Sequence, residues 1–309
     1  MIEVRGLAKR FGQVTAVDDL TFDVAPGRVT GFVGPNGAGK TTTMLMMLGL
    51  VHPDAGEVRI GGRHYHDLPV PLAEVGALLD AKAFHGGRRA RDHLLYLAAS
   101  NHIPAGRVDA VLNLTGITTA AKRRTKSFSL GMGQRLGIAA AMLGDPAVLV
   151  LDEPENGLDP EGIVWIRGLM RDLAAQGRTV LFSSHFISEI ALAADQLVVI
   201  GKGRLIADRP VSELIASSSA QSVLVRSPRP DALAGPLRAA GAIVEPADGA
   251  ALHVTGLEAA AIADLAAASG IPIYELTPLQ ASLEEAFMKL TRDSVEFRAD
   301  AQTAGRTGQ

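Results

Sequence analysis

A short segment near the N-terminus has the residue types and the spacing that bind phosphate. It reads Gly34-Pro35-Asn36-Gly37-Ala38-Gly39-Lys40-Thr41 and fits the pattern G-x-x-x-x-G-K-S/T. Its glycines let the backbone curl so that several N–H groups converge on phosphate oxygens. Lys40 is placed to contact the β- and γ-phosphates, and the hydroxyl of Thr41 is placed to bind Mg²⁺. The pattern predicts a nucleoside triphosphate site, which kinases, GTPases and many motors share.

The surroundings of this segment are those that a phosphate-binding loop needs. Val29–Val33 is a short apolar run that precedes it, and Thr41–Leu50 suits a helix that follows it. A helix that begins near Lys40 adds its positive N-terminal end to the loop. The alternative is a glycine-rich turn with an exposed lysine, and the order strand, loop, helix argues against it.

Two acids follow a second apolar run. Ala147–Leu151 has the continuous apolar character of a strand that is buried on both faces of a parallel sheet. Asp152 is then placed to hold the metal, often through water, and Glu153 to polarise an attacking water as general base. Asp152-Glu153-Pro154 is otherwise a polar turn at the end of a buried strand. Its presence together with the phosphate loop favours the metal and the base.

Strands and helices alternate along much of the chain. Thr179–Phe182 and Leu197–Ile200 repeat the buried apolar pattern, and Gly162–Ala175 reads as a helix. Thr21–Val24 and Glu57–Ile60 read as strands near the N-terminus. The alternation predicts an α/β fold with a mainly parallel sheet.

A further segment resembles the signature of one family, the ATPase subunits of ATP-binding-cassette (ABC) transporters. It reads Phe128-Ser129-Leu130-Gly131-Met132 and is followed by Gly133-Gln134-Arg135-Leu136, where the family has L-S-G-G-Q and a helix. Ser129 and Gly131 match, whereas Leu130 and Met132 depart. Ser129 also suits an ordinary helix N-cap. Its place shortly before the Asp152 strand favours the signature, and the resemblance covers about residues 2–215.

The resemblance implies roles for other residues. Asp159, in Gly157-Leu158-Asp159-Pro160, matches an aspartate that communicates across a dimer of ATPase subunits. His185, in Ser183-Ser184-His185, matches a switch histidine that contacts the γ-phosphate and helps to position water. Phe11 matches an aromatic residue that stacks on adenine, a contact worth ~1–3 kcal/mol. The segment from Gly34 to Thr42 would bind the nucleotide, with ATP and Mg²⁺ as cofactors. In the family, the signature residues reach the ATP of the other subunit.

One position departs from the family in a way that bears on chemistry. The family has a glutamine between the phosphate loop and the signature that contacts Mg²⁺ and the attacking water. This chain has no glutamine between Gln13 and Gln134, and Asp80 occupies the matching position after Val75–Leu79. A carboxylate binds Mg²⁺ but donates no hydrogen bond when ionised. We hypothesise that Asp80 contacts the metal and nucleotide with altered coupling to the partner.

The resemblance also implies the domain organisation. Residues 1–215 would form a P-loop NTPase (RecA-like) core with an antiparallel β subdomain and an α-helical subdomain at about residues 80–143. Ala216–Gln221 is Ser-rich and reads as a linker. Residues 222–291 predict a small α+β domain built from two strand–helix–strand halves. The predicted strands and helices there are Val223–Val225, Asp231–Ala239, Ile243–Glu245, Leu252–Val254, Glu258–Ala267 and Ile273–Leu276. Residues 298–309 have little to bury and predict a disordered tail.

Composition narrows the partners. The net charge of −3 and the pI of about 6.2 argue against nucleic acid as a partner. The absence of cysteine excludes disulfides and thiolate metal sites and fits a reducing cytosol. No apolar run approaches the ~18 residues that cross a bilayer. A membrane role therefore requires a separate transmembrane permease, with the ATPase peripheral on the cytoplasmic face of the cell membrane.

The resemblance then implies a clamp in which two ATPase subunits sandwich two ATP molecules and drive the permease. A homodimer and a pairing with a different cassette are both open. Ser282-Leu283-Glu284-Glu285-Ala286-Phe287 resembles the closing helix of drug- and polyketide-export ATPases, which favours export of a small molecule or drug. Basic runs at residues 86–91 and 122–126 are solvated surface, permease contacts or, as a third alternative, nucleic-acid contacts.

Two alternatives stay open. One is a soluble ABC-type ATPase acting in a non-transport process on ribosomes or DNA. The ribosomal type usually carries two cassettes and the DNA type long coiled coils, and this sequence shows one cassette and no heptad run. The other is a small-molecule kinase, which would leave the signature, Asp159 and His185 without a role.

Overall fold

The computed structural model describes residues 1–218, 222–279 and 283–291. The chain forms two compact units, one comprising Met1–Pro210 and one comprising Val211–Lys289. The tail predicted at residues 298–309 lies outside the described residues. Of the helices in the described ranges, none combines the length and the apolar character that a membrane span requires.

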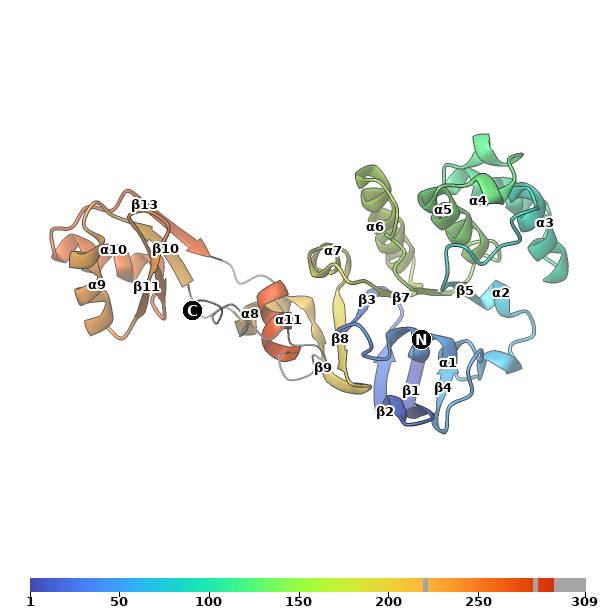
Figure 1. The fold of residues 1–309 in the computed structure, drawn as a ribbon, viewed down its shortest axis with the longest axis horizontal. Coiled ribbons are helices and arrows are strands. Elements are labelled where there is room, and N and C mark those ends of the chain that lie inside the picture. The colour runs from blue at the N-terminus through green and yellow to red at the C-terminus, as the bar shows by residue number, and fades with distance from the viewer. Residues whose placement is uncertain (219–221, 280–282, 292–309) are drawn as a thin grey trace, which may run out of the picture. The chain divides into compact units, whose positions relative to one another are not determined.

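A six-stranded sheet forms the centre of the first unit, with the strand order β5-β6-β7-β3-β8-β9 (Figure 1). Its strands are β3 (Arg28–Val33), β5 (Val75–Leu78), β6 (Val148–Leu151), β7 (Thr179–Ser183), β8 (Gln196–Gly201) and β9 (Arg204–Pro210). All neighbours pair in parallel except β8 and β9. Every residue of β6 and β7 is buried, because a parallel sheet covered on both faces needs apolar side chains on both. The predicted α/β class with a mainly parallel sheet is confirmed.

An antiparallel sheet of three strands lies on the opposite side of the central sheet from α6 (Figure 1). Its strands are β1 (Ile2–Phe11), β2 (Val14–Val24) and β4 (Ala55–Ile60) in the order β2-β1-β4. The predicted strand Thr21–Val24 is only the end of β2, because register shifts against β1 interrupt the alternation earlier in the strand. A buried cluster that includes Leu20, Phe32 and Met44 joins this sheet, helix α1 and the central sheet into one core.

The helices of the first unit are α1 (Lys40–Met47), α2 (Pro71–Glu74), α3 (Ala90–Ser100), α4 (Gly106–Leu114), α5 (Leu130–Ala141), α6 (Pro160–Ala175) and α7 (Ile187–Ala193), with 3₁₀ turns at Tyr65–Asp67, Thr118–Ala120 and Thr125–Ser127. Figure 1 shows α3, α4 and α5 gathered at one end of the unit. The region predicted as helical from about residue 80 begins with a loop, and its first helix starts only at Ala90. The predicted helix Thr41–Leu50 ends at Met47, because Gly49 adopts a φ of 66°.

The second unit contains a four-stranded antiparallel sheet with the order β11-β12-β10-β13. Its elements are α8 (Val211–Ser218), β10 (Ser222–Arg226), α9 (Pro230–Ala239), β11 (Ile243–Ala247), β12 (Ala251–Thr255), α10 (Ala259–Ala268), β13 (Glu275–Leu279) and α11 (Leu283–Thr291). From β10 to β13 the elements follow the predicted order and form a split β-α-β arrangement. Buried side chains such as Val225, Leu237, Val254 and Ile262 make its core.

Two boundaries in the second unit differ from the prediction. Residues 216–218, read as linker, belong to α8, because Val211 and Leu214 give this helix buried apolar positions that the serines conceal. Residues 219–221 lie outside the described part. The last strand begins at Glu275 rather than Ile273, because its pairing with β10 runs from Glu275 opposite Arg226 to Leu279 opposite Ser222.

Candidate active site

The phosphate-binding loop joins β3 to α1, as predicted. Gly39 has a φ of 101°, and a Cβ there would lie 2.3 Å from the carbonyl oxygen of Ala16, so only glycine fits. A Cβ at Gly34 would lie 2.3 Å from the carbonyl oxygen of Ile200. Within the described part of the chain, no side chain caps the start of α1. The N–H groups of its first turn are therefore available to an anion.

Lys40 lies beneath this loop with 8% of its surface exposed. Its Nζ donates to the carbonyl oxygen of Gly34 at 2.7 Å and to that of Pro35 at 3.2 Å. Burial lowers the pKa of Lys40, and the nearby carboxylates of Glu153 and Asp152 oppose that shift. A buried ammonium of this kind is stabilised by any anion that enters the loop.

Oxygen atoms suited to a metal meet at the ends of α1 and β6. The hydroxyl of Thr41 donates to Oδ2 of Asp152 at 2.8 Å, and the hydroxyl of Ser183 donates to Oδ1 of the same carboxylate. No group of three or more His, Cys, Asp or Glu side chains among the described residues is arranged to hold a metal. Mg²⁺ fits such a sparse donor set, since it binds through one or two protein oxygens together with waters and substrate phosphates. The predicted ligands Thr41 and Asp152 are thus brought together.

Glu153 is held by its backbone in a conformation that few residues adopt. Its φ is 48°, in the left-handed region. Its N–H donates to Oγ of Ser183 at 3.0 Å, and its carbonyl accepts from Nε2 of Gln134 at 2.9 Å. Its carboxylate accepts from Nδ2 of Asn156. Strain that is fixed by three partners in this way is typical of functional sites.

His185 lies directly beside this carboxylate. Its Nδ1 is 3.4 Å from Oε2 of Glu153, and its ring packs on that of Phe186 with centroids 3.9 Å apart. The imidazole side chain is 41% exposed, so a ligand can reach it. The structure therefore joins the predicted base and the predicted switch histidine.

Sequence reasoning missed three supports of Glu153, namely Ser183, Asn156 and the side chain of Gln134. Ser183 ends β7 and reaches β6 only because these strands are neighbours. Asn156 lies about one turn after Glu153, and this spacing is the sequence signal from which their contact could have been predicted. The contact of Gln134 is long-range and left no trace in the local pattern.

The signature segment contacts the loop that follows Glu153. Oγ of Ser129 accepts from the N–H of Met132 at 3.3 Å, which makes Ser129 the N-cap of α5. A Cβ at Gly131 would lie 2.5 Å from the carbonyl oxygen of Gly157, so this close approach needs glycine. Ser129 is exposed despite its capping bond, and both interpretations of this serine remain compatible with the structure.

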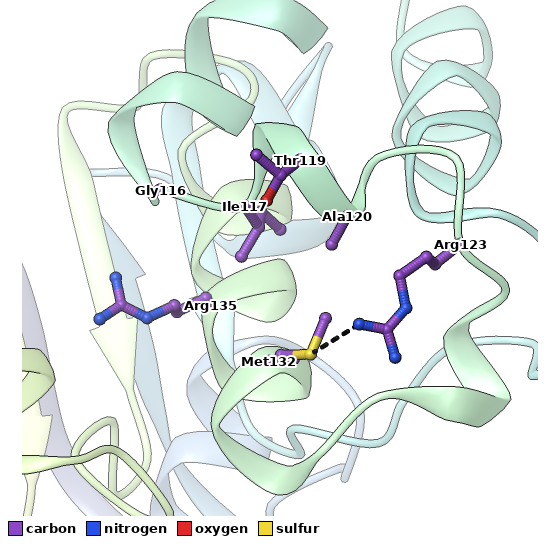
Figure 2. A pocket seen from close by; sticks show the side chains of 7 residues that line it. All are labelled: Gly116, Ile117, Thr119, Ala120, Arg123, Met132 and Arg135. Carbon is purple, nitrogen blue, oxygen red and sulfur yellow. Dashed lines mark hydrogen bonds between the residues drawn. The ribbon is translucent and has the colours of Figure 1, made fainter.

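Asp159 caps the next helix and lies near Arg135, one of the residues that line a hollow beside the signature. Its Oδ1 accepts from the N–H of Gly162 at 2.9 Å and lies 3.9 Å from Nη2 of Arg135. Figure 2 shows Arg135 and Arg123 on either side of Met132, around a hollow of about 430 Å³. Arg123 contacts Sδ of Met132 at 3.9 Å. Arg135 of the signature helix thus presents a cation next to Asp159.

The remaining predicted site residues lie at the edge of this centre. Phe11 ends β1 with 51% of its surface exposed, as a residue that stacks on a base must be, and Nζ of Lys9 lies 5.5 Å from the ring centroid. Asp80 is exposed just after β5, and its Oδ1 accepts from the N–H of Lys82 at 2.8 Å. The hydrogen bonds described for the Asp152 carboxylate come from Thr41 and Ser183, and the contact of Asp80 with the metal and nucleotide stays a prediction.

An apolar groove of about 450 Å³ opens next to Asp80. Residues of α1, of the end of β5, of α3 and of α5 line it, including Leu48, Phe84 and Leu97. His93 forms part of its wall with 8% of its surface exposed, and its Nδ1 has no hydrogen-bond partner among the described residues. Burial and then the charge of Arg88 lower the pKa of His93, which keeps the ring neutral at pH 7.

Comparison with known proteins places this geometry in a family. The model of the ABC transporter family matches residues 17–156, and that of a domain of unknown function (DUF8746) matches residues 221–284. The uncharacterized ABC transporter ATP-binding protein YhcH of Bacillus subtilis is 33% identical over 299 residues, which cover 96% of this chain and 97% of that protein. The Nod factor export ATP-binding protein I of Paraburkholderia xenovorans is 38% identical over 245 residues, covering 75% of this chain and 78% of that protein.

A solved ATP-binding subunit of an ABC transporter superposes with a TM-score of 0.65 at 25% identity, covering 70% of this chain and 92% of that one. The likeness to solved structures confirms the P-loop NTPase fold that the phosphate loop and the apolar strands predicted. Similarity over nearly the whole length of a relative, together with the joined phosphate loop, Asp152, Glu153 and His185, leads to one conclusion. The chain belongs to the ABC transporter ATP-binding proteins and is an ATP-hydrolysing, ATP-binding subunit of such a transporter.

Proposed function

We propose that two copies of this chain close around two ATP molecules and that hydrolysis drives a separate membrane permease that exports its cargo. The observation that carries the proposal is the meeting of Asp152, Glu153 and His185 at the ends of β6 and β7. Lys40 and Thr41 approach the same point from the phosphate loop. ABC transporter ATPases work with membrane permeases and dimerise, and the details below are specific to this chain.

The residues divide the chemistry of hydrolysis among them. The loop N–H groups and Lys40 hold the β- and γ-phosphates and offset the charge that develops there. Glu153 accepts a hydrogen bond from the attacking water and takes its proton. His185 lies 3.4 Å from that carboxylate and donates to a γ-phosphate oxygen. Thr41 and Asp152 would hold Mg²⁺, with Asp80 as a further proposed ligand, and the metal would neutralise phosphate charge when bound.

A second copy completes the site from outside the chain. Ser129 is exposed, and the Asp159 side chain is 67% exposed, so both are available to a partner. Gly131 packs against Gly157, which ties the signature helix to the loop that follows Glu153. Movement of the signature on a partner's phosphates is therefore transmitted to the catalytic loop of its own chain. ATP would shift the population toward the closed dimer by binding it more tightly than the open one.

The groove beside Asp80 is our candidate for the docking site of the permease. It is mainly apolar, lies between the core and the helices α3 and α5, and is lined in part by Leu79 and Asp80, the position where the nucleotide would be sensed. His93 adds a polar nitrogen, Nδ1, that has no hydrogen-bond partner within the described part of the chain, to a mainly apolar wall. An apolar side chain of a permease segment on the cytoplasmic face of the membrane would fill the groove, with a polar group beside it for the imidazole.

Two features support export rather than import. The closing segment from Leu283 to Phe287 resembles that of drug-export ATPases, and it forms part of α11 in the structure. The similarity to a Nod factor export protein covers 75% of this chain. On this proposal residues 1–215 are the ATP-binding domain, and residues 222–291 are an accessory domain with a regulatory or dimer-stabilising role.

A pull-down tests the proposal. Tagged Glu153→Gln protein with ATP and Mg²⁺ would be mixed with detergent-solubilised membranes of the source cell, and the bound proteins would be identified. Recovery of one polytopic membrane protein in near-equal amount supports the transporter. Recovery of ribosomes, nucleic acid or exclusively soluble proteins would instead support an ATPase of this family that acts outside transport.

A further inference from the structure

Glu155 is a buried carboxyl group that the mechanism above does not use. It lies in the turn that follows β6, and 5% of its surface is exposed. Glutamate is almost never so deeply buried unless it is paired, because its charge loses hydration. Its Oε1 accepts a hydrogen bond from the hydroxyl of Ser184, and burial raises its pKa. A carboxyl group kept in such a place at a cost in free energy calls for a role.

Ser184 connects this carboxyl group to the turn that carries the switch histidine. The Ser184 side chain is itself buried, with 1% of its surface exposed. Its Oγ accepts from the N–H of Phe186 at 2.9 Å, while its proton goes to Glu155. A hydroxyl has one proton to donate and two lone pairs, so both bonds form at once. His185 lies between Ser184 and Phe186 in the sequence, the two residues whose hydrogen bond closes this turn.

The same turn brings His185 to the catalytic carboxylate. Nδ1 of His185 lies 3.4 Å from Oε2 of Glu153, and that carboxylate also accepts from Asn156. Glu153 and Glu155 therefore approach the turn together from the segment after β6. One contacts the histidine, and the other reaches the backbone on both sides of it through Ser184. Because His185 is 41% exposed, packing alone does not fix its ring.

We propose that Glu155 is a positioning residue: through Ser184 it holds residues 184–186 so that the imidazole of His185 stays beside Glu153. This inference rests on the role proposed above for His185. A displacement of about 1 Å in a catalytic group lowers turnover by as much as ~10²-fold. Loss of the hydrogen bonds that run from Glu155 through Ser184 should therefore reduce kcat and leave the affinity of the phosphate loop for ATP nearly unchanged.

The test is a double-mutant cycle on ATP turnover. Glu155→Ala and Ser184→Ala would each be measured alone and in a His185→Ala background, with kcat and KM for ATP determined separately. We expect each single variant to lower kcat about tenfold or more while KM changes less than about threefold. In the His185→Ala background, neither should lower kcat further, because there is no imidazole left to position. Glu155→Gln keeps an acceptor for Ser184 and should retain most of the parental kcat.

The possible outcomes separate the positioning role of Glu155 from its alternatives. Equal losses in the presence and absence of His185 would mean a general structural role and would overturn the inference, as would a parental kcat for both alanine variants. If His185→Ala itself turned over ATP at the parental rate, the proposed role of the histidine would be wrong. The positioning role of Glu155 would then be wrong as well. Should Glu155→Ala fold poorly, Ser184→Ala makes the smaller lesion and decides alone. Asp172→Asn removes an exposed carboxylate of α6 and serves as the matched control.

Discussion

Nδ1 of His185 lies 3.4 Å from Oε2 of Glu153, although the two residues follow different strands. The register of the parallel pair explains the proximity, since Leu151 of β6 lies opposite Phe182 of β7. The carboxyl ends of parallel neighbours meet at one edge of a sheet, which is where such folds bind their ligands. The proposed general base and the proposed switch histidine are thus brought together by two neighbouring buried strands.

Replacing Glu153 by glutamine should separate ATP binding from hydrolysis. The phosphate loop stays intact, so ATP still binds, whereas loss of the general base should slow hydrolysis ~10²-fold or more. We expect Glu153→Gln to accumulate as an ATP-bound dimer in saturating ATP-Mg²⁺. Sedimentation velocity measures this directly, and Asp172→Asn is the control that should not trap a dimer. A Glu153→Gln protein that stays monomeric at saturating ATP-Mg²⁺ would contradict the clamp.

The chelation of magnesium should have a separate effect. On the proposed mechanism Thr41 and Asp152 would supply the protein oxygens for the metal, and the hydroxyl of Thr41 donates to Oδ2 of Asp152 at 2.8 Å. EDTA or Asp152→Asn should therefore abolish turnover while nucleotide still protects the protein against thermal unfolding, because Lys40 and the loop N–H groups act without the metal. Thermal shift with ATP plus EDTA measures the binding that remains. If ATP protected only in the presence of Mg²⁺, the loop would depend on the metal for affinity as well.

Asp80 should matter more when the permease is present. It lines the groove just after β5, and its Oδ1 accepts from the N–H of Lys82. We expect Asp80→Ala to lower permease-stimulated hydrolysis about tenfold and Asp80→Asn to lower it less, because an amide oxygen still binds a hard cation. Asp80→Gln introduces the family's residue and reports whether the altered side chain changes coupling. Parental rates for Asp80→Asn and Asp80→Ala, with and without the permease, would refute a role for this aspartate.

The sequence predicted the centre of the site better than its surroundings. The strand ending at Leu151 and the loop at Gly34 were visible because continuous apolar runs and close-packed glycines leave local patterns. Ser183 was not visible as a partner of Asp152, because that contact depends on which strands are neighbours. The wall position of His93 was hidden for the same reason. The serines at the end of α8 misled because composition masks the buried positions of Val211 and Leu214.

The groove yields a prediction for coupling. Leu97→Glu would put a charge into an apolar groove, where desolvation opposes it. We expect this variant to lose the permease in a pull-down and to keep ATP-dependent dimerisation. Tyr96→Glu is the matched control, because Tyr96 belongs to the same helix and is 54% exposed outside the lining of the groove. Equal loss of the permease in both variants would indicate that α3 tolerates no added charge. It would contradict the proposal that the permease docks in the groove.

The last prediction concerns how stability depends on pH, through the buried carboxyl group of Glu155. Burial raises its pKa above the ordinary 4.5, so the folded chain binds this proton more tightly than the unfolded chain does. As pH rises above 4.5, the unfolded state ionises first, and the folded state loses relative stability until the raised pKa is passed. Glutamine cannot ionise and still accepts from Ser184. The stability of Glu155→Gln relative to the parent should therefore increase with pH across that interval and be constant below it.

Asp54 provides a control of opposite sign in the same unit. Its hydrogen bonds from Lys9 and from the N–H of Arg10 lower its pKa below the ordinary 3.8. That contribution is present above pH 3.8 and is lost as the pH falls through the lowered value, so Asp54→Asn should be less stable than the parent at neutral pH but not at strongly acid pH. Trp165, the single tryptophan, reports unfolding of the first unit by fluorescence in urea.

A stability difference for Glu155→Gln that does not change between pH 4 and pH 8 would show that this carboxyl group titrates alike in both states. The site would then hold a carboxyl group that burial leaves unperturbed, and the desolvation argued from its 5% exposure would have to be offset by its hydrogen bond from Ser184.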